Sequence, residues 1–373
     1  MPKQRVLFLT LRVFSATGGI EKVCRAAAFA LYSWQKQLPQ QRDVQVYSMY
    51  DESTQIDSRY LAVDQFHGFG LKRFQFMLAA MKAARSSDIV LLSHVNLLLV
   101  VPLIWLLAPR KKIMLIAHGI EVWRSLPNWK RFLLRRLAQI LCVSQFTQDQ
   151  LTQQHGVSAN NLTVVWNGLD PFLLAPASAE EGRAFRATLG IPDSALVMMT
   201  LTRISSTEGY KGYDRLIELM PRLIERYPSL YYVLVGKHDP SEKARLDQLL
   251  AQHGCTERVK FTGFLPDEQV PACFAASDVY VMPSKKEGFG LVFIEALFYG
   301  KAVVAGGKDG SVDALLQGKL GHLVDPDHPE SILAGVCSAL NHSPNLLAQR
   351  TLVEQHYGFV AYQHRLLRAL NLA

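Results

Sequence analysis

The feature that most constrains the fold is a repeated alternation of short apolar runs with longer amphipathic segments. Many of the short runs are apolar at nearly every position, which is typical of strands in a parallel sheet covered on both faces. Because helical patterns lie between most of them, they predict an α/β protein with two doubly wound domains. The runs are residues 5–10, 44–50, 88–94, 112–119, 139–144 and 162–168 in the first half, and 195–203, 230–237, 258–265, 278–284, 302–307 and 321–326 in the second.

A change in composition separates the two halves. Residues 169–194 are rich in proline, alanine and acidic residues, and we interpret them as a linker that begins near Asp170 and becomes a helix around Glu180. A chain of 373 residues also exceeds the size at which a single core usually stops growing. Ligands of doubly wound sheets bind outside the carboxyl ends of the strands, so two such domains face to face would form a cleft. From Ser331 onward the pattern is helical.

The cysteines and the hydrophobic segments argue against several classes of protein. Five cysteines are scattered without a C-x-x-C pair, so neither a disulfide framework nor a zinc site is predicted. The amino-terminal run has the length of a strand and no small-residue cleavage site, which favours a first strand over a signal peptide. Residues 89–108 approach the length of a membrane span, but His94, Asn96 and Pro102 interrupt them and favour a strand–helix division. These features indicate a reducing, cytoplasmic setting.

The formal net charge of +8 indicates a basic surface. Residues 123–137, WRSLPNWKRFLLRRL, combine five basic side chains with Trp123, Trp129 and Phe132 at helical spacing. This pattern is typical of an amphipathic helix that lies on an anionic membrane. It fits equally well a surface helix whose leucines face the core and whose arginines face water, and the sequence leaves both open. Nucleic acid is disfavoured as a partner, because no known binding motif accompanies the charge.

Polar residues and glycines follow several predicted strands, where ligands of such sheets bind. Gly18 and Gly19 form either a plain turn or an anion-binding site at the amino terminus of the following helix. His118 could donate to a ligand hydroxyl or serve only the structure. Arg203 and Lys211 flank a polar loop before a helix. We interpret them as a clamp on a diphosphate, against the alternative of two solvated charges.

The segment SKKEGFGLVFIEALFYG, from Ser284 to Gly300, combines a strand end, a glycine loop and a helix. Its glycines lie at the predicted amino terminus of the helix, where free N–H groups and the helix dipole favour phosphate. Glu287 lies in the loop, and Glu295 lies more than one turn into the helix. Since carboxylates repel phosphate, we interpret these two as acceptors for sugar hydroxyls. The segment therefore predicts a nucleotide-sugar pocket.

Glu287 and Glu295 form the E-x7-E pattern of retaining GT-B glycosyltransferases, and the chain resembles those of family GT4. The resemblance implies two Rossmann-like domains that face each other across a cleft, one of residues 1–172 for the acceptor and one of residues 173–355 for the nucleotide sugar. A carboxyl-terminal helix, residues 356–373, would cross back to the first domain. Seven motifs follow the family's order and spacing over essentially the whole chain. They are Gly18-Gly19, His118-Gly119, Asn167-Gly168, Arg203 with Lys211, VLVG ending at Gly236, VKFTGF ending at Phe264, and EGFGLVFIEAL.

The resemblance also implies roles for these residues. Arg203 and Lys211 would hold the donor diphosphate and stabilise the charge that grows on it in the transition state. Glu295 would bind the ribose, Glu287 the transferred sugar, and His118 the hydroxyls of that sugar near the reacting carbon. Retention of anomeric configuration without a metal ion or cofactor is implied as well. The other donor-binding positions are Gly18, Gly19, Gly236, Phe264, Gly288, Phe289, Gly290 and Leu291.

The expected reaction is transfer of a hexose from a UDP-glucose or GDP-mannose type of donor to a lipid-linked or polysaccharide acceptor in cell-surface glycan biosynthesis. The expected location is the cytoplasm, with peripheral contact to the membrane through residues 123–137. Two alternatives stay open: a sugar-nucleotide epimerase or hydrolase, and a non-catalytic nucleotide-sugar sensor. Lys237 with His238 and the stretch from Asp309 to Ser311 depart from the family pattern, which leaves the nucleotide undecided.

A possible metal motif, D-x-D, occurs at Asp325 to Asp327. It lies between a predicted strand and a predicted helix, far in sequence from the phosphate loops. We therefore interpret it as a turn that caps the following helix. An NAD dehydrogenase and a P-loop enzyme are disfavoured, because neither glycine motif follows a predicted strand.

Overall fold

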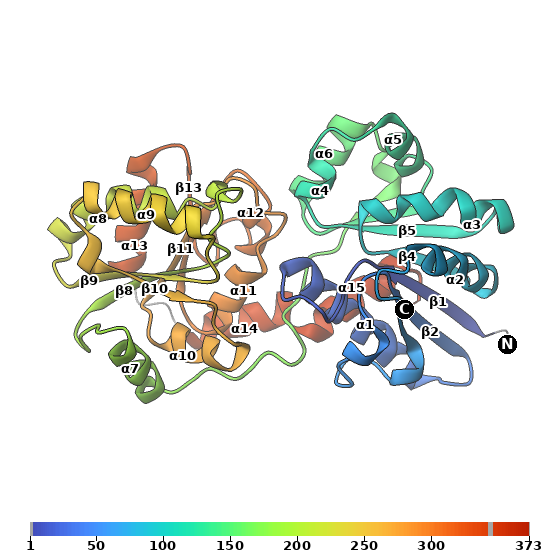
Figure 1. The fold of residues 1–373 in the computed structure, drawn as a ribbon, viewed down its shortest axis with the longest axis horizontal. Helices are drawn as coiled ribbons and strands as arrows, with labels where there is room; N and C mark the ends of the chain where they lie inside the picture. Colours follow the sequence, from blue (N-terminus) through green and yellow to red (C-terminus); the bar gives the residue numbers. More distant parts are fainter. Residues whose placement is uncertain (1–2, 342–345, 373) are drawn as a thin grey trace. The chain divides into compact units, whose positions relative to one another are not determined.

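The computed structural model describes residues 3–341 and 346–372, and the chain forms two compact units. Unit 1 comprises Met1–Pro171 and His356–Ala373, and unit 2 comprises Phe172–Gln355. Each unit is built on one parallel sheet with helices on both faces (Figure 1). The predicted α/β class with two doubly wound sheets is therefore confirmed.

The sheet of unit 1 has seven strands in the order β3-β2-β1-β4-β5-β6-β7. The order reverses between β1 and β4, so the switch point of the sheet lies there. The strands are β1 (Gln4–Thr10), β2 (Arg42–Ser48), β3 (Phe66–Gly68), β4 (Ile89–Leu92), β5 (Lys112–Ala117), β6 (Gln139–Cys142) and β7 (Leu162–Val164). The helices are α1 (Gly19–Gln37), α2 (Arg73–Ser86), α3 (Val101–Leu107), α4 (Ile120–Trp123), α5 (Asn128–Leu134), α6 (Gln145–His155) and α15 (Phe359–Ala369).

The two faces of this sheet are covered by different helices. Leu7 and Leu9 of β1 pack into a core with residues of α2, α3 and α6. The opposite face is covered by α1 and α15, which lie side by side in Figure 1. The indole N–H of Trp34 in α1 donates to the carbonyl oxygen of Leu372 at 3.0 Å. The carboxyl-terminal segment therefore completes the core of unit 1.

The sheet of unit 2 has six strands in the order β10-β9-β8-β11-β12-β13, and its switch point lies between β8 and β11. The strands are β8 (Leu196–Leu201), β9 (Leu230–Val235), β10 (Val259–Gly263), β11 (Val279–Met282), β12 (Ala302–Gly306) and β13 (His322–Val324). The helices are α7 (Ala179–Thr188), α8 (Tyr213–Arg226), α9 (Pro240–Gln252), α10 (Val270–Ala275), α11 (Leu291–Phe298), α12 (Ser311–Ala314) and α13 (Pro329–Asn341), and α14 (Leu346–Tyr357) leads back to unit 1.

Alternating residues of the strands fill both faces of this second sheet. Met198 packs with α8, α9 and α13 in one buried cluster. On the other face, the ring of Tyr280 lies 5.9 Å from that of Phe293 in α11 and 6.2 Å from that of Phe274 in α10, measured between ring centroids. Both faces are therefore apolar, which explains the nearly continuous apolar runs in the sequence.

One local prediction differs from the structure, and one strand was not predicted. Residues 123–137 do not form one amphipathic helix, because α4 ends at Trp123 and α5 begins only at Asn128, after Pro127. The short strand β3 was not singled out from the sequence. Residues 89–108 do divide as predicted, into β4, a 3-10 segment (Val95–Val100) and α3. In the described ranges 3–341 and 346–372, no helix has both the length and the hydropathy that a membrane crossing needs. Of the predicted helical tail, residues 342–345 lie outside the described residues.

Candidate functional site

In unit 2 the predicted phosphate-binding residues gather at the switch point of the sheet. Arg203 follows β8 and Glu287 follows β11, and these two strands are paired directly. Lys211 ends a short 3-10 turn before α8. A Cβ atom on Gly212 would lie 2.7 Å from the carbonyl oxygen of Pro283, so the loop after β8 is pressed against the end of β11. The sheet therefore brings together loops that are about 80 residues apart in the chain.

Lys211 and Glu287 form a direct ion pair, in which Nζ donates to Oε1. Both side chains are largely buried, with exposed fractions of 14% and 12%. Burial alone would lower the pKa of Lys211, but the Glu287 carboxylate and Tyr210 outweigh it and raise that pKa above its ordinary value. Lys211 is therefore an ammonium group at neutral pH. An ammonium has three N–H donors, so two remain for phosphate oxygens once Glu287 has taken one.

Arg203 has a different environment from Lys211. Its guanidinium group pairs with Glu208 in the same loop. Its side chain is 76% exposed, whereas that of Glu208 is 11% exposed. Arg203 therefore presents a fork of donors at the surface of the loop, suited to a phosphate that approaches from solvent.

Gly236 and Phe264 lie further out along the same edge of the sheet. Gly236 follows β9, and its N–H donates to the carbonyl oxygen of Gly263 at 3.0 Å. A Cβ atom at Gly236 would lie 1.9 Å from the carbonyl oxygen of Thr202, so only glycine fits there. The ring of Phe264 is 60% exposed after β10, two strand spacings or roughly 10 Å from β8. An exposed ring at this edge can stack on a nucleobase.

The loop from Gly288 to Gly290 leads into α11, which begins at Leu291 as predicted. Gly290 adopts a φ of 87°, and a Cβ atom there would lie 2.3 Å from Cδ2 of Phe293. Phe289 is only 2% exposed and anchors the loop in the core. Because Gly290 has no side chain with which to cap the helix, the first N–H groups of α11 suit an anion.

Glu295 lies one turn further along α11 and is 4% exposed. Burial, together with the carboxylates of Glu287 and Glu295, raises the pKa of Tyr280. Both members of the E-x7-E pattern therefore lie close enough to Tyr280 in β11 to affect its phenol. Their predicted roles toward the ribose and the transferred sugar remain predictions.

Asp309, which follows β12, fixes the position of the Glu287 loop. Its carboxylate accepts the N–H of Glu287 at 2.6 Å and that of Ser311 at 2.9 Å. The N–H of Gly310 in turn donates to the carbonyl oxygen of Glu287 at 2.9 Å. Asp309 is 2% exposed, and burial raises its pKa to about 7. The sequence marked this stretch only as a departure from the family pattern, and the structure gives Asp309 a positioning role.

In unit 1, His118 follows β5 and lies beside the switch point. Its Nε2 atom lies 2.7 Å from the carbonyl oxygen of Ser93, and its backbone N–H donates to Glu121 Oε1 at 2.5 Å. Burial lowers the pKa of His118 to about 4, so the ring is neutral at pH 7. A neutral ring that donates Nε2–H to Ser93 keeps Nδ1 as an acceptor, which suits a ligand hydroxyl.

Gly18 and Gly19 lie where β1 turns into α1, at the amino terminus of a helix of 19 residues. A Cβ atom at Gly19 would meet nothing within 4 Å, so a ligand can approach its backbone closely. The preceding loop is held by Asp51, a buried residue after β2 that the sequence reasoning missed. Its carboxylate accepts the N–H of Val13 at 2.6 Å and that of Ser15 at 2.8 Å.

The predicted site residues therefore form two groups. Arg203, Lys211, Glu287 and the α11 loop converge within unit 2, with Gly236 and Phe264 along the same edge. Gly18, Gly19 and His118 belong to unit 1, beside the switch point of its own sheet.

The Asp325 to Asp327 stretch forms a turn, as predicted. Asp325 Oδ1 accepts the N–H of Asp327 at 3.0 Å. Both carboxylates also pair with lysines, Asp325 with Lys308 and Asp327 with Lys285 and Lys308. In the part of the chain that the structure describes, no cluster of His, Cys, Asp and Glu side chains has the arrangement of a metal site.

Comparison with known proteins identifies the family. The model for glycosyl transferases group 1 matches residues 183–352, and the model for Glycosyltransferase Family 4 matches residues 30–172. A GDP-mannose-dependent alpha-(1-6)-phosphatidylinositol monomannoside mannosyltransferase from Mycolicibacterium smegmatis is 31% identical over 270 residues, which cover 69% of this chain and 68% of that protein. The chain belongs to the family GT4 glycosyltransferases. The resemblance inferred from the sequence is thus confirmed.

Two other similar proteins carry glucose, not mannose, in their descriptions. A 2-deoxystreptamine glucosyltransferase from Streptomyces kanamyceticus is 30% identical over 187 residues, which cover 50% of this chain and 47% of that protein. The crystal structure of Anabaena HepE in complex with UDP and glucose has a TM-score of 0.80 at 20% identity, covering 99% of this chain and 100% of that chain. At this identity the likeness concerns the fold, which is the GT-B fold of glycosyltransferases.

Proposed function

We propose that this glycosyltransferase transfers a hexose from UDP or GDP to a lipid-linked or polysaccharide acceptor, with retention of the anomeric configuration and without a metal ion. The observation that carries the proposal is the buried Lys211–Glu287 pair beside Arg203 and the first amides of α11. Cationic groups and oriented N–H donors at one switch point suit a leaving diphosphate, whose charge grows during the reaction. In that arrangement Glu287 orients Lys211 and offers its second oxygen to a sugar hydroxyl.

The relatives support both candidate nucleotides. The mannosyltransferase from Mycolicibacterium smegmatis is described as GDP-mannose-dependent, and Anabaena HepE was crystallised with UDP. The rim beyond β9 carries Lys237 and His238, where the nucleobase is expected. Lys237 has three N–H donors and His238 has a donor or an acceptor at each ring nitrogen, so both side chains can contact a nucleobase.

The first experiment is a donor panel of UDP, GDP and ADP with their common hexose derivatives. Binding is scored by thermal shift, and activity by slow hydrolysis of the donor, because a ligand that binds the native state stabilises it by mass action. We expect one nucleotide to raise the melting temperature. Lys211→Ala removes a charge-assisted hydrogen bond worth about 1.5–3 kcal/mol, so it should weaken that nucleotide roughly 10- to 150-fold.

Two variants sharpen the result. Glu295→Ala should also weaken the nucleotide if Glu295 binds the ribose. Lys319→Ala removes an exposed charge in unit 2, away from the switch point, and serves as the matched control. No response to any nucleotide, or equal effects of Lys211→Ala and Lys319→Ala, would refute the pocket.

Retention and metal independence are tested on the same preparation. The anomeric configuration of the product is read by NMR against that of the donor sugar. Turnover is compared in EDTA and in magnesium. An inverted product, or activity abolished by EDTA and restored by magnesium, would remove that part of the proposal. Loss of transfer in Glu287→Gln with unchanged nucleotide binding would separate a transferase from a non-catalytic sensor.

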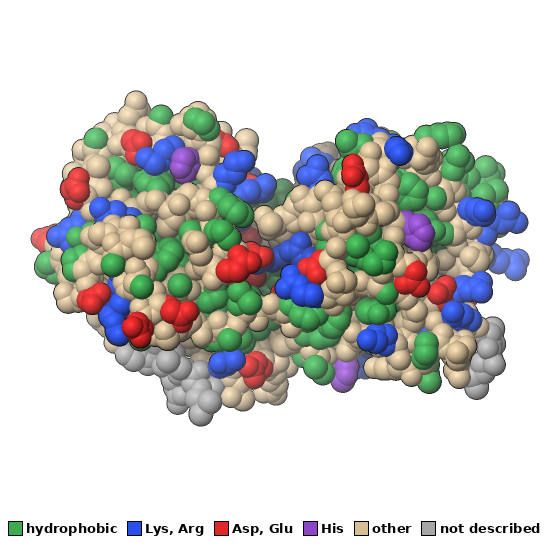
Figure 2. Space-filling view, turned by 60° about the horizontal axis from the view of Figure 1, so that its bottom comes forward, with side chains coloured by type: hydrophobic (Ala, Val, Ile, Leu, Met, Phe, Trp, Pro, Cys, Tyr) green, Lys and Arg blue, Asp and Glu red, His purple; other side chains and the backbone are tan. Residues whose placement is uncertain are grey.

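We further propose that unit 1 contacts an anionic membrane, as a lipid-linked acceptor would require. Residues 69–137 hold twelve Lys and Arg but only two acidic residues, Asp88 and Glu121, a net charge of +10, so the rest of the chain carries −2. Figure 2 shows Lys and Arg side chains along the outer edge of unit 1, at the right of the view, with hydrophobic side chains between them. Nine of the fifteen large hydrophobic side chains exposed in the described residues belong to this segment: Leu71, Phe74, Leu78, Leu99, Leu106, Leu107, Ile120, Trp129 and Phe132.

Vesicle flotation tests the membrane contact. The side chains of Trp129 and Phe132 are 44% and 52% exposed on α5. Trp129→Ser with Phe132→Ser should weaken flotation on vesicles that contain phosphatidylglycerol, because apolar area and charge both contribute to interfacial binding. The matched control is Val63→Ser with Val360→Ser, at positions that are 67% and 63% exposed. Equal flotation of the two double variants would remove α5 from the contact.

A further inference from the structure

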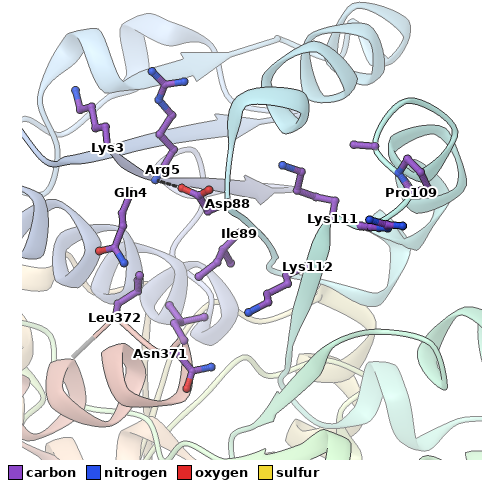
Figure 3. A pocket seen from close by; sticks show the side chains of 13 residues that line it. Lys3, Gln4, Arg5, Asp88, Ile89, Pro109, Lys111, Lys112, Asn371 and Leu372 are labelled. Atoms are coloured by element: carbon purple, nitrogen blue, oxygen red, sulfur yellow. Dashed lines mark hydrogen bonds between the residues drawn. The ribbon is translucent and has the colours of Figure 1, made fainter. Parts of the chain in front are cut away.

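A pocket of about 640 Å³ lies in unit 1 at the amino-terminal ends of β1, β4 and β5 (Figure 3). Gln4, Ile89 and Lys112 are the first residues of these three strands, and all three line it. Gly19 and His118 lie instead at the carboxyl ends of β1 and β5. A strand of seven residues spans roughly 20 Å, so the pocket is separate from the predicted sugar-binding residues of unit 1.

The lining of this pocket is strongly basic. Lys3, Arg5, Arg110, Lys111 and Lys112 contribute five positive charges, and Asp88 is the only acidic residue among the lining residues. Asp88 Oδ2 accepts the backbone N–H of Arg5 at 2.8 Å, the bond drawn in Figure 3. Strand alternation places Lys3 and Arg5 on one side of the strand edge and Gln4 on the other, where Figure 3 also shows Lys112. Positive charge therefore meets the pocket from both sides.

Part of this charge has a structural role. The helices of a doubly wound unit run against the strands, so α2, α3 and α15 all end near this edge with carbonyl groups that attract cations. Lys111 fills that role, because Nζ donates to the carbonyl oxygen of Ser87 at the end of α2. Lys3 lies 3.7 Å from the Asp43 carboxylate. These two lysines are therefore occupied by the protein itself.

The positive charges of Arg5, Arg110 and Lys112 have no such structural role. Their side chains form no hydrogen bond or ion pair with any other residue in the ranges 3–341 and 346–372. All three are exposed and line one pocket, so a bound anion would reduce the repulsion between their charges. Capping of the helices does not require them.

The rest of the lining shows what kind of anion would fit. Ile89, Leu370 and Leu372 form apolar walls, and exposed Leu107 ends α3 just before the lining residue Ala108. The volume far exceeds that of a single inorganic ion. We propose that this pocket is a second binding site of the protein, for a phosphate-bearing ligand with an apolar or neutral remainder. An anionic lipid head group and a soluble phosphate ester share this chemistry.

The proposal is tested with the triple variant Arg5→Ser, Arg110→Ser and Lys112→Ser in the full chain. The matched control is Arg183→Ser, Arg226→Ser and Lys319→Ser, which removes the same charge from exposed positions of unit 2. Because all six side chains are exposed, both variants should keep the melting temperature of the unmodified protein. Nucleotide binding by unit 2 should be equal in both variants. Failure of the pocket proposal would leave this binding intact, whereas failure of the proposed function would show as no nucleotide binding in either variant.

Two probes distinguish the two sources of the ligand. Glycerol 3-phosphate is titrated by calorimetry, and vesicles of phosphatidylglycerol in phosphatidylcholine are tested by flotation at increasing NaCl. Near a membrane each basic residue contributes about 1 kcal/mol, so loss of three should weaken vesicle binding roughly 100-fold relative to the control. Selective loss of glycerol 3-phosphate binding identifies a soluble ester, and selective loss of flotation identifies a lipid head group. If the triple variant matches the control with both probes, the pocket is not an anion site and the proposal is overturned.

Discussion

Gly310→Ala is the sharpest test of how the Glu287 loop is held. Gly310 has φ −65° and ψ −8°, a conformation that alanine adopts without strain. Its added Cβ atom, however, would lie 2.0 Å from the carbonyl oxygen of Gly288 and 2.8 Å from that of Glu287. Cβ atoms essentially never approach closer than 3.0 Å, so the Gly288 carbonyl must move by about 1 Å or more. The substitution therefore displaces the loop without altering any charge.

The displaced loop carries Glu287, whose position determines the geometry of the candidate site. Glu287 pairs with Lys211, and the next residues carry the amides that lead into α11. A misplacement of about 1 Å in a positioning element can cost roughly 100-fold in rate. We therefore expect kcat/KM for the nucleotide sugar to fall by roughly two orders of magnitude in Gly310→Ala. The affinity for the nucleotide alone should fall less, because Arg203 follows a different strand.

Gly209→Ala is the matched control. Gly209 begins the 3-10 turn that ends at Lys211, and a Cβ atom there would meet nothing within 4 Å. It should leave both nucleotide affinity and kcat/KM close to those of the unmodified enzyme. The assay is steady-state donor turnover, with isothermal titration of UDP or GDP as the second readout. A Gly310→Ala enzyme that behaves like Gly209→Ala in both measurements would show that the loop position does not govern the site.

Four further predictions rest on His118, Asp309 and Gly236. His118→Ala should abolish transfer yet leave nucleotide affinity unchanged in titrations, because His118 belongs to unit 1. Burial lowers the His118 pKa from 6.5 to about 4. The stability that the neutral ring contributes is therefore complete above pH 6.5 and is lost as the pH falls toward 4. Melting curves at pH 7 and pH 5 would show this loss. Burial raises the Asp309 pKa from 3.8 to about 7, so stability is lost as the pH rises from 4 to 7, by at most about 1.4 kcal/mol per pH unit. Asp309→Asn should remove this dependence, and equal pH profiles of the melting temperature would contradict it. Gly236→Ala should destabilise unit 2 by about 1–3 kcal/mol in urea unfolding, since its Cβ atom would lie 1.9 Å from the carbonyl oxygen of Thr202.

The architecture was predictable because parallel strands buried on both faces leave a strong trace in the sequence. The runs around β1, β4, β5 and β11 are apolar at nearly every position, and no amphipathic helix shares that pattern. The edge strand β3 was missed because Phe66-His67-Gly68 contains a single large apolar residue and so forms no apolar run. The break at Pro127 was missed because the spacing of aromatic and basic residues outweighed a single helix-ending residue.

The candidate site was predictable only in part, for a related reason. Charged side chains after strands, such as Arg203, Lys211 and Glu287, are visible in a sequence, and the sheet topology brings them together in unit 2. Contacts between backbone segments leave no comparable trace. The close approach of Gly310 to Gly288 depends on how β12 ends beside β11, which no local pattern reveals.

Two buried aspartates show what supports the loops in both units. Asp51 follows β2 and accepts N–H groups of the loop after the neighbouring strand β1. Asp309 follows β12 and accepts an N–H group of the loop after the neighbouring strand β11. In each unit an aspartate at the end of one parallel strand ties down the loop that follows the neighbouring strand. The side-chain oxygens of each aspartate accept more than one N–H bond, so a single buried residue fixes several backbone positions.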